Sequence, residues 1–372
     1  MRRNANRSTT GRVRAALSAV AAVCVVTAAL PAAASAEPTA VAGGAADGGA
    51  GVERISVAAD GAQADDDSAG ASITPDGRRI VFSSSATNLT SDGTTGGDRV
   101  YVRDQRTRRT ERLGALSPLE PPVISGDGEY VAYSARWFND VRIRLDQVST
   151  GREISVNCLY SCSQSSLSAD GRHIAHAVVS PRQPSFGQRI EVQDWNANAK
   201  ETVAALGHTL PSRPSISGDG RHVAYQDGQA EDILVWDRTG GTTSGPIEGP
   251  AEGATLVQLS DDGSKVVYLS GSDTYVHDMS SGTAQLVADV RGVAIDPTGR
   301  HLLYTPHDTN GPSLMLRDLR TGTDEIVSDQ PASAGTDAVS TGGRDVVFQS
   351  AADDIVPGDT NGTSDVFVRR FY

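Results

Sequence analysis

One short phrase recurs seven times along the chain, and it limits the fold more than any other feature. Its clearest copy is SISGDGRHVAY at residues 215–225, and related copies include VISGDGEYVAY and QLSDDGSKVVY. Each copy joins two apolar runs through a turn that carries a glycine; the seven are Gly77, Gly128, Gly171, Gly220, Gly263, Gly299 and Gly343. Repeats of this kind predict an array of similar supersecondary units.

A second phrase follows each glycine turn, and it alternates apolar and polar residues as a half-buried strand does. Examples are RVYVRD and DILVWD, and six copies end on aspartate: Asp104, Asp146, Asp194, Asp237, Asp278 and Asp318. A tight turn and a weaker strand come next. Each unit therefore has four antiparallel strands, a to d, and we expect the aspartates to accept N–H groups of the turn after strand c.

The spacing of the units is that of propeller blades. Successive turn glycines lie 51, 43, 49, 43, 36 and 44 residues apart, and four strands in about 40–45 residues is the period of a blade. Through S-x-D-G-[RK]-x-[IV]-x-[FY] and the terminal V-x-D, the repeats resemble those of TolB-type, WD-like β-propellers. The resemblance covers nearly all of the mature chain. It implies a propeller fold, and propellers of such families act as binding scaffolds, as parts of peptidases and as sugar-cleaving enzymes.

The last repeat ends at Tyr372 directly after its strand c, whereas residues 52–58 (VERISVA) read as a strand d placed before the first strand a. We expect the N-terminal strand to complete the last blade and so remove an exposed sheet edge. The sequence thus predicts an all-β, seven-bladed propeller of four-stranded antiparallel blades over residues 52–372, with six blades as the alternative.

Residues 1–36 read as a secretory signal peptide. Five arginines precede an apolar run, and Ala34-Ser35-Ala36 supplies a small-residue cleavage pattern. Residues 37–51 are rich in Ala and Gly and read as a flexible leader. No later stretch reaches the ~20 apolar residues of a membrane span. We expect an exported, secreted protein without a membrane span, and a monomer.

The balance of charge limits the partners. Without the five N-terminal arginines, 28 basic residues face 46 acidic ones. Nucleic acid and anionic membranes require a basic face, so neither is expected as a partner. Cations and basic ligands remain compatible with this composition.

Two cysteines follow the signal peptide, Cys158 and Cys162, in NCLYSCSQ. A spacing of four residues in an exported protein favours a local disulfide that staples a loop.

The order of the strands sorts the connections onto two faces. The a–b and c–d turns share one face, here called the turn face, and the b–c and d–a connections share the other, the loop face. Length varies mainly on the loop face, where binding residues are expected. Candidates for ligand or partner contact there are the aromatic b–c loop of the second repeat and nearby or facing side chains: Trp137, Phe138, Asn139, Tyr160, His208 and His307.

The other histidines do not indicate a metal site. His173, His222 and His301 share one slot after the turn glycine, where other repeats have Arg79, Tyr130, Lys265 or Asp345. Motifs such as G-x-S-x-G, G-x-x-x-x-G-K and H-E-x-x-H are missing from the sequence, so no catalytic residue is assigned.

A cation site is a hypothesis for the sector where the first and last repeats meet. Both repeats have long b–c loops with an Asp-x5-Asp spacing, and an acidic d–a link lies between them. Carboxylate and amide oxygens on glycine-rich loops are the ligands that Ca²⁺ takes, although Asn-Gly is also common in plain turns. The candidate ligands are Asp65, Asp66, Asp67, Asp92, Asp98, Asp359, Asn361 and Asp365.

These observations predict a secreted, non-catalytic scaffold that binds a small-molecule, glycan or protein ligand through its loop face, with Ca²⁺ as the one cofactor considered. The alternative is an extracellular carbohydrate lyase or hydrolase with a metal ion in the central channel.

Overall fold

The computed structural model describes residues 51–93, 97–156, 158, 160–180, 187–207, 210–251 and 253–371. The predicted signal peptide and all but the last residue of the predicted leader lie outside these residues. Within them, no helix is both long and apolar enough to cross a membrane.

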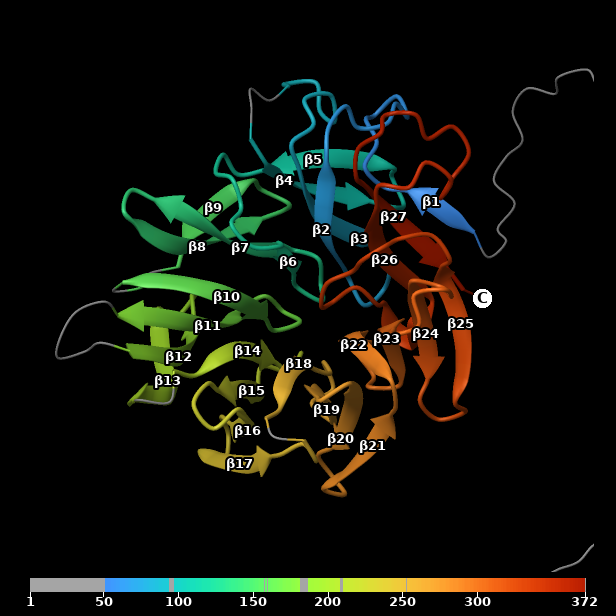
Figure 1. Cartoon of the computed structure of the whole chain (residues 1–372). Helices are drawn as coiled ribbons and strands as arrows, with labels where there is room; N and C mark the ends of the chain where they lie inside the picture. Colours follow the sequence, from blue (N-terminus) through green and yellow to red (C-terminus); the bar gives the residue numbers. More distant parts are fainter. Residues whose placement is uncertain are drawn as a thin grey trace, which may run out of the picture. The chain divides into compact units, whose positions relative to one another are not determined.

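The described residues form seven antiparallel sheets arranged as a ring, and each sheet is one blade (Figure 1). Six blades have four strands in chain order, as the repeats predict. Their bounds are, for blade one, β2 Ser68–Ile73, β3 Arg79–Ser84, β4 Arg99–Asp104 and β5 Arg109–Leu113; for blade two, β6 Val123–Ile124, β7 Tyr130–Trp137, β8 Asp140–Gln147 and β9 Arg152–Ser155; and for blade three, β10 Ser161–Leu167, β11 His173–Ser180, β12 Gly187–Asp194 and β13 Ala199–Gly207.

The second half of the ring continues the pattern. Its bounds are, for blade four, β14 Ser212–Ile216, β15 His222–Asp227, β16 Asp232–Asp237 and β17 Thr242–Ile247; for blade five, β18 Thr255–Leu259, β19 Lys265–Ser270, β20 Asp273–Asp278 and β21 Thr283–Val287; for blade six, β22 Val290–Ile295, β23 His301–Pro306, β24 Leu314–Asp318 and β25 Thr323–Ser328; and for blade seven, η1 Thr341–Gly343, β26 Asp345–Ser350, β27 Asp365–Arg370 and β1 Val52–Arg54.

Blade seven is closed by the N-terminal strand, which confirms that prediction. Strand β1 pairs antiparallel with β27, so that Val52 lies opposite Arg369 and Arg54 opposite Phe367. The innermost segment of this blade is held to β26 by two isolated bridges, Val339 to Val346 and Ser333 to Gln349. The first and last described segments of the ring are thereby hydrogen-bonded in one sheet, and seven blades are confirmed over six.

Apolar side chains fill the space between adjacent blades, because both faces of every sheet are covered by a neighbour. One cluster joins the cores of blades six, seven and one, from Leu303 through Phe348 to Phe82, each at most 1% exposed. Aromatic rings stack across strands b and c in several blades; Phe348 and Phe367 have ring centroids 5.6 Å apart. Burial of such side chains contributes about 1.5–3 kcal/mol each relative to exposure.

The repeated turn is held by its own serine and aspartate. In blade four, the Ser217 hydroxyl donates to the Asp219 carboxylate (2.6 Å) and accepts the N–H of His222 (2.9 Å). Asp219 also accepts the N–H of Arg221 at 2.8 Å. Gly220 has a φ of 71°, a left-handed conformation that glycine adopts without the cost that a Cβ would impose. The S-x-D-G phrase is therefore a turn motif, and its residues are occupied by that role.

The variable slot after each turn glycine makes the contact between blades. A Cβ built on Gly171 would lie 2.3 Å from the ring of Tyr130, and one on Gly220 would lie 2.9 Å from Nδ1 of His173. The same relation runs around the whole ring, with each slot side chain covering the turn glycine of the next blade: Arg79 over Gly128, Tyr130 over Gly171, His173 over Gly220, His222 over Gly263, Lys265 over Gly299, His301 over Gly343 and Asp345 over Gly77. Side chains of different chemistry can occupy this slot because the contact requires only that they cover the glycine of the next blade.

Five of the six aspartates at the ends of strands c accept turn N–H groups, as expected. Asp237, for example, accepts those of Thr239 and Gly240, and its carboxylate also binds Arg221 at 2.7 Å. Asp146 is the exception, and its expected role is wrong. The strand of blade two is shifted by one residue, so Gln147 lies opposite Tyr130 where other blades have aspartate, and the buried Asp146 accepts the Tyr133 hydroxyl at 3.0 Å.

Candidate functional site

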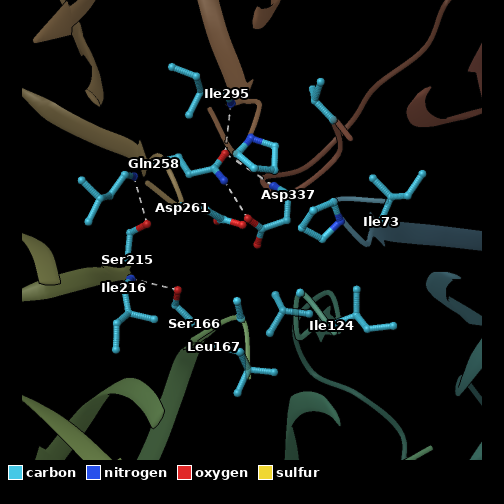
Figure 2. A pocket seen from close by; sticks show the side chains of 17 residues that line it. Ile73, Ile124, Ser166, Leu167, Ser215, Ile216, Gln258, Asp261, Ile295 and Asp337 are labelled. Carbon is cyan, nitrogen blue, oxygen red and sulfur yellow. Dashed lines mark hydrogen bonds between the residues drawn. The ribbon is translucent and has the colours of Figure 1, made fainter. Parts of the chain in front are cut away.

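The central channel is lined by strands a and the turns that follow them, with residues from all seven blades (Figure 2). The cavity between these residues has a volume of about 30 Å³, so the channel is narrow at this level. Each blade contributes one branched aliphatic residue from the second position of the repeat: Ile73, Ile124, Leu167, Ile216, Leu259, Ile295 and Val339. These aliphatic residues form one ring of the wall, and the remaining surface of the channel is mainly polar.

Backbone hydrogen bonds tie the turns together around the channel axis on the turn face. The N–H of Ala169 donates to the carbonyl of Gly218 at 2.8 Å, and the N–H of Gly218 donates to the carbonyl of Asp261 at 2.7 Å. Between blades seven and one, the N–H of Thr341 donates to the carbonyl of Pro75 at 2.9 Å. These bonds satisfy backbone groups that would otherwise be buried without partners, and they fix the width of the channel at this end.

Two carboxyl groups, Asp261 of blade five and Asp337 of the link into blade seven, point toward each other in the middle of the ring (Figure 2). Asp337 is held by Gln258, whose amide donates to it at 2.6 Å while the amide oxygen accepts the N–H of Ile295 at 3.1 Å. Within the described part of the chain, no hydrogen bond to the Asp261 carboxylate is found.

This arrangement raises the pKa of both carboxyl groups. Burial, and then the charge of Asp337, raise the pKa of Asp261 from 3.8 to about 7, and burial raises the pKa of Asp337 to about 6. Two carboxyl groups that face each other in a narrow channel cannot both ionise without cost, so ionisation of one opposes ionisation of the other. The channel is thus a place where a proton or a positive charge is stabilised.

Exposed apolar side chains gather on the loop face of blades two to four. We call these residues the apolar sector: Leu119, Trp137, Phe138, Val179 and Leu210, which are 40–84% exposed. Hydrogen bonds and strand pairing connect the middle of this sector, because the N–H of Val141 donates to Ser161 at 3.1 Å and Ser161 lies opposite Val179. In the described residues, the other large exposed apolar side chains, Leu286 and Ile326, belong to outer strands of blades five and six.

Phe138 stands out in this sector. It is 84% exposed at the tip of the β7–β8 hairpin, and its φ of 53° is left-handed, a conformation that disfavours side chains other than Gly, Asn and Asp. Trp137 packs edge-on against it, with ring centroids 5.4 Å apart. The backbone strain costs free energy, and the exposed ring gains little burial from the described fold beyond its contact with Trp137.

The structure places the other predicted contact residues in different places. Asn139 lies beside Phe138 in the same turn, and Tyr160 immediately precedes Ser161 at the edge of the apolar sector. Cys158 and Cys162, both buried, form a disulfide at this edge. His307 lies in the loop of blade six, where its Nδ1 is 3.2 Å from Asp289. His208 lies outside the described residues.

The predicted acidic sector is organised around an arginine. Arg54 forms ion pairs with Asp359 (2.8 Å) and Asp365 (3.3 Å) and donates to the amide oxygen of Gln63 at 2.6 Å. The side chains of Arg54, Asp359 and Asp365 are 11%, 4% and 0% exposed. Burial raises the pKa of Asp365, and the nearby guanidinium opposes this effect. Arg54 therefore supplies positive charge at the position where calcium was expected.

The remaining predicted calcium ligands are divided between that group and blade one. Asn361 donates to Asp365 (3.0 Å) and to the carbonyl of Ala64, and Asp67 accepts the N–H of Ser364 at 2.8 Å. The others bind elsewhere, each within its own loop or blade: Asp65 to Thr87, Asp66 to the N–H of Asp67, Asp92 to Arg112 and Asp98 to Ser85. In the described residues no group of three or more His, Cys, Asp or Glu is arranged to hold a metal ion.

Replacing Arg54 with leucine should be strongly destabilising. Two buried carboxylates would lose their counter-charge, and breaking a buried ion pair from one side costs about 3–5 kcal/mol. Urea unfolding should show this loss, whereas Arg99→Leu, which removes an arginine bound to Ser117 and loop carbonyls, should cost less than about 1 kcal/mol. Equal effects of the two changes would contradict the role given to Arg54.

The calcium hypothesis has its own test. If calcium binds this sector, a chelator should lower the melting temperature of the wild-type protein, and the double variant Asp359→Ala/Asp365→Ala should not respond to the chelator. An unchanged wild-type melting temperature would reject calcium.

Reasoning from the sequence missed the channel pair. The signal was present in the repeat alignment, where Asp261 occupies a position that is otherwise small or uncharged: Pro75, Gly126, Ala169, Gly218, Pro297 and Thr341. Asp337 likewise stands two residues before Val339, where the first two repeats have Ala71 and Pro122. A charged residue at a repeat position that is uncharged in the other repeats indicates that this residue has a role beyond forming the blade.

Comparison with known proteins adds support for the fold. No protein-family model matches the chain, and no curated protein matches it in sequence. Among solved structures, an oligogalacturonate lyase in complex with manganese is 14% identical, with 86% of this chain and 93% of that chain covered and a TM-score of 0.63.

An oligogalacturonate lyase from Vibrio parahaemolyticus is 13% identical over the same shares of both chains, with a TM-score of 0.64. TolB from Acinetobacter baumannii is 14% identical, with 69% of this chain and 62% of that chain covered and a TM-score of 0.48. At such identities a likeness concerns fold alone. The chain is a β-propeller similar in fold to the two lyases, as its repeats predict.

Proposed function

We propose that this protein is an exported binding module that holds a protein partner on its loop face and performs no chemistry there. The observation that carries the proposal is Phe138, which combines 84% exposure with a left-handed backbone at the tip of a hairpin. A strained and exposed aromatic residue supports a role in contact, since the fold itself would be more stable without it.

The surroundings of Phe138 support a partner of protein size. Trp137 adds a second exposed ring, and Leu119, Val179 and Leu210 extend the apolar sector over three blades. Aromatic side chains at the centre of an interface supply most of its binding energy, with polar residues around them. The rigid blades position these loops, as is common for binding surfaces.

The test replaces Phe138 with asparagine. Asparagine tolerates a left-handed backbone, so F138N should leave the free energy of unfolding unchanged or raise it by up to about 1 kcal/mol. The same change should weaken partner capture by at least about tenfold, because a central aromatic contact is worth about 2 kcal/mol or more. Chemical cross-linking to envelope and medium fractions of the organism that makes the protein, with quantitative mass spectrometry, measures capture.

Leu286→Asn is the matched control, since Leu286 is 51% exposed on the outer strand β21, away from the loop face. A partner that is lost with F138N and retained with L286N supports the proposal. Identical captured proteins for wild type, F138N and L286N would overturn it.

The carboxyl pair in the channel favours a second candidate, a carbohydrate lyase or hydrolase. The structurally similar lyase is described with manganese, but here the channel offers two carboxyl groups and the Gln258 amide, with no described histidine. This donor set does not fit a manganese site of three or more His, Cys, Asp or Glu ligands. Turnover of oligogalacturonate that is lost in Asp261→Asn would favour this candidate over the binding module.

A further inference from the structure

Charge is distributed unequally between the two faces of the propeller. On the turn face, basic side chains are paired with the aspartates that end strands c. Arg172 binds Asp194 at 2.6 Å and Arg221 binds Asp237 at 2.7 Å, and similar pairs occur in other blades, as in Arg78 with Asp104 and Arg300 with Asp318. The exposed turn-face residues outside such pairs include both cations, such as Arg106 and Arg320, and acids, such as Asp76 and Asp219, so neither charge is in clear excess on this face.

The loop face carries carboxylates without such partners. Among the described residues of the b–c and d–a connections, the exposed acids that form no ion pair are Asp60, Asp65, Asp66, Asp67, Asp98, Glu231, Glu248, Asp308, Asp329, Asp353 and Asp354. Basic side chains are fewer in these connections, and two of them, Arg54 and Arg112, are already bound to carboxylates. The surplus negative charge of the chain is thus concentrated on the face that holds the apolar sector.

The apolar sector interrupts this acidic surface. Between Gly114 and Leu210, the described carboxyl groups of the loop-face connections are Glu120 and Asp140, and both have partners. Glu120 accepts the Ser134 hydroxyl at 2.8 Å, and Asp140 lies 3.8 Å from Arg142. The acids without partners begin in the blades on either side, with Asp98 in blade one and Glu231 in blade four. Within the sector, Arg136 and Arg213 are exposed cations for which no ion pair is found in the described residues. The acids of blades one and four lie outside them, and an apolar anchor that carries positive charge at its edges is complementary to this flanking negative charge.

We propose that the partner bound on the loop face is a protein segment that presents an apolar anchor between lysine or arginine side chains. This inference rests on the proposed function and deepens it by specifying the partner's charge. The apolar anchor would cover Trp137 and Phe138, and the cationic side chains would lie over blades one and four. Complementary charge of this kind raises the rate of association and selects against acidic competitors.

The test uses three synthetic peptides with the same leucine and tryptophan content and net charges of about +4, 0 and about −4. Fluorescence anisotropy measures their binding to the full chain at about 20 mM and about 300 mM salt. The cationic peptide should bind at least about tenfold more tightly than the anionic one at low salt, and this preference should shrink at high salt as the charges are screened.

Charge-reversed variants locate the effect. Asp98→Lys/Glu231→Lys should remove most of the preference for the cationic peptide, whereas Glu325→Lys, on the exposed outer strand β25, should preserve it. Equal affinities for the three peptides, or no binding of any of them, would overturn the charge inference. Equal affinities that F138N abolishes would leave the proposed function standing, so the two failures are distinguishable.

Discussion

Replacing Asp261 with asparagine is expected to stabilise the protein, and to do so more at pH 8 than at pH 4. In the folded state the pKa of this group is raised to about 7 by burial and by Asp337, whereas in the unfolded chain it is near 3.8. Between these values the folded protein binds more protons than the unfolded one, so this group's contribution to stability falls as the pH rises.

A difference of about 3 in pKa corresponds to about 4 kcal/mol at a pH above both values. The gain should be smaller, about 2–3 kcal/mol, because the titration of Asp337 is coupled to that of Asp261 and because the asparagine amide must also be buried. At pH 4 the Asp261 carboxyl is protonated in the folded protein, so the variant should gain little there.

Urea unfolding of wild type and D261N at several pH values measures the effect. The quantity to compare is the difference between the two proteins, since other carboxyl groups also change the stability of both with pH. Asp329→Asn, which removes an exposed carboxyl group from the loop face, should show a difference near zero throughout. A D261N advantage that is the same at pH 4 and pH 8 would contradict a raised pKa in the channel.

The propeller could be predicted from the sequence because the information lies in the repeat itself. The turn glycines and the alternating polarity of strands b and c are local features of the sequence. The strand at residues 52–54 has no partner in the first repeat, and the free edge of β27 is the place where it can pair. Local rules also explain the strand-c aspartates. These rules gave the wrong role for Asp146, because a shift of one residue in strand pairing moves its side chain to the other face of the sheet.

The channel pair and the role of Arg54 could not be predicted in the same way. Asp261 and Asp337 belong to blades that are not adjacent in the ring, and their meeting depends on the width of the channel. Arg54 precedes the first repeat, yet its partners Asp359 and Asp365 lie near the other end of the sequence. Acidic residues alone favoured a calcium site, because the pattern held no indication of which cation would lie between them.

A turn glycine can be needed for its left-handed φ or for the space it leaves to a side chain of the neighbouring blade, and a change to alanine should separate these two roles. Gly171 and Gly151 have nearly the same φ, 64° and 66°, but a Cβ on Gly171 would lie 2.3 Å from Tyr130, whereas nothing lies within 4 Å of one on Gly151. Alanine at Gly151 should cost about 1 kcal/mol through backbone strain alone. At Gly171 the overlap with Tyr130 of the preceding blade should add about 1–3 kcal/mol.

A double-mutant cycle identifies the source of the additional cost. Tyr130→Ala destabilises the protein by itself, because Tyr130 also packs against Trp195, with ring centroids 5.1 Å apart. In the Y130A background, however, G171A should cost only about 1 kcal/mol, since the space taken by the Tyr130 ring is free. The coupling between the two positions, measured by urea unfolding, should therefore be about 1–3 kcal/mol. If no coupling is measured, the slot side chains only lie near the turn glycines, and their contact does not set the distance between blades. Because the same contact is repeated at all seven boundaries, its loss at one boundary should weaken the closure of the whole ring.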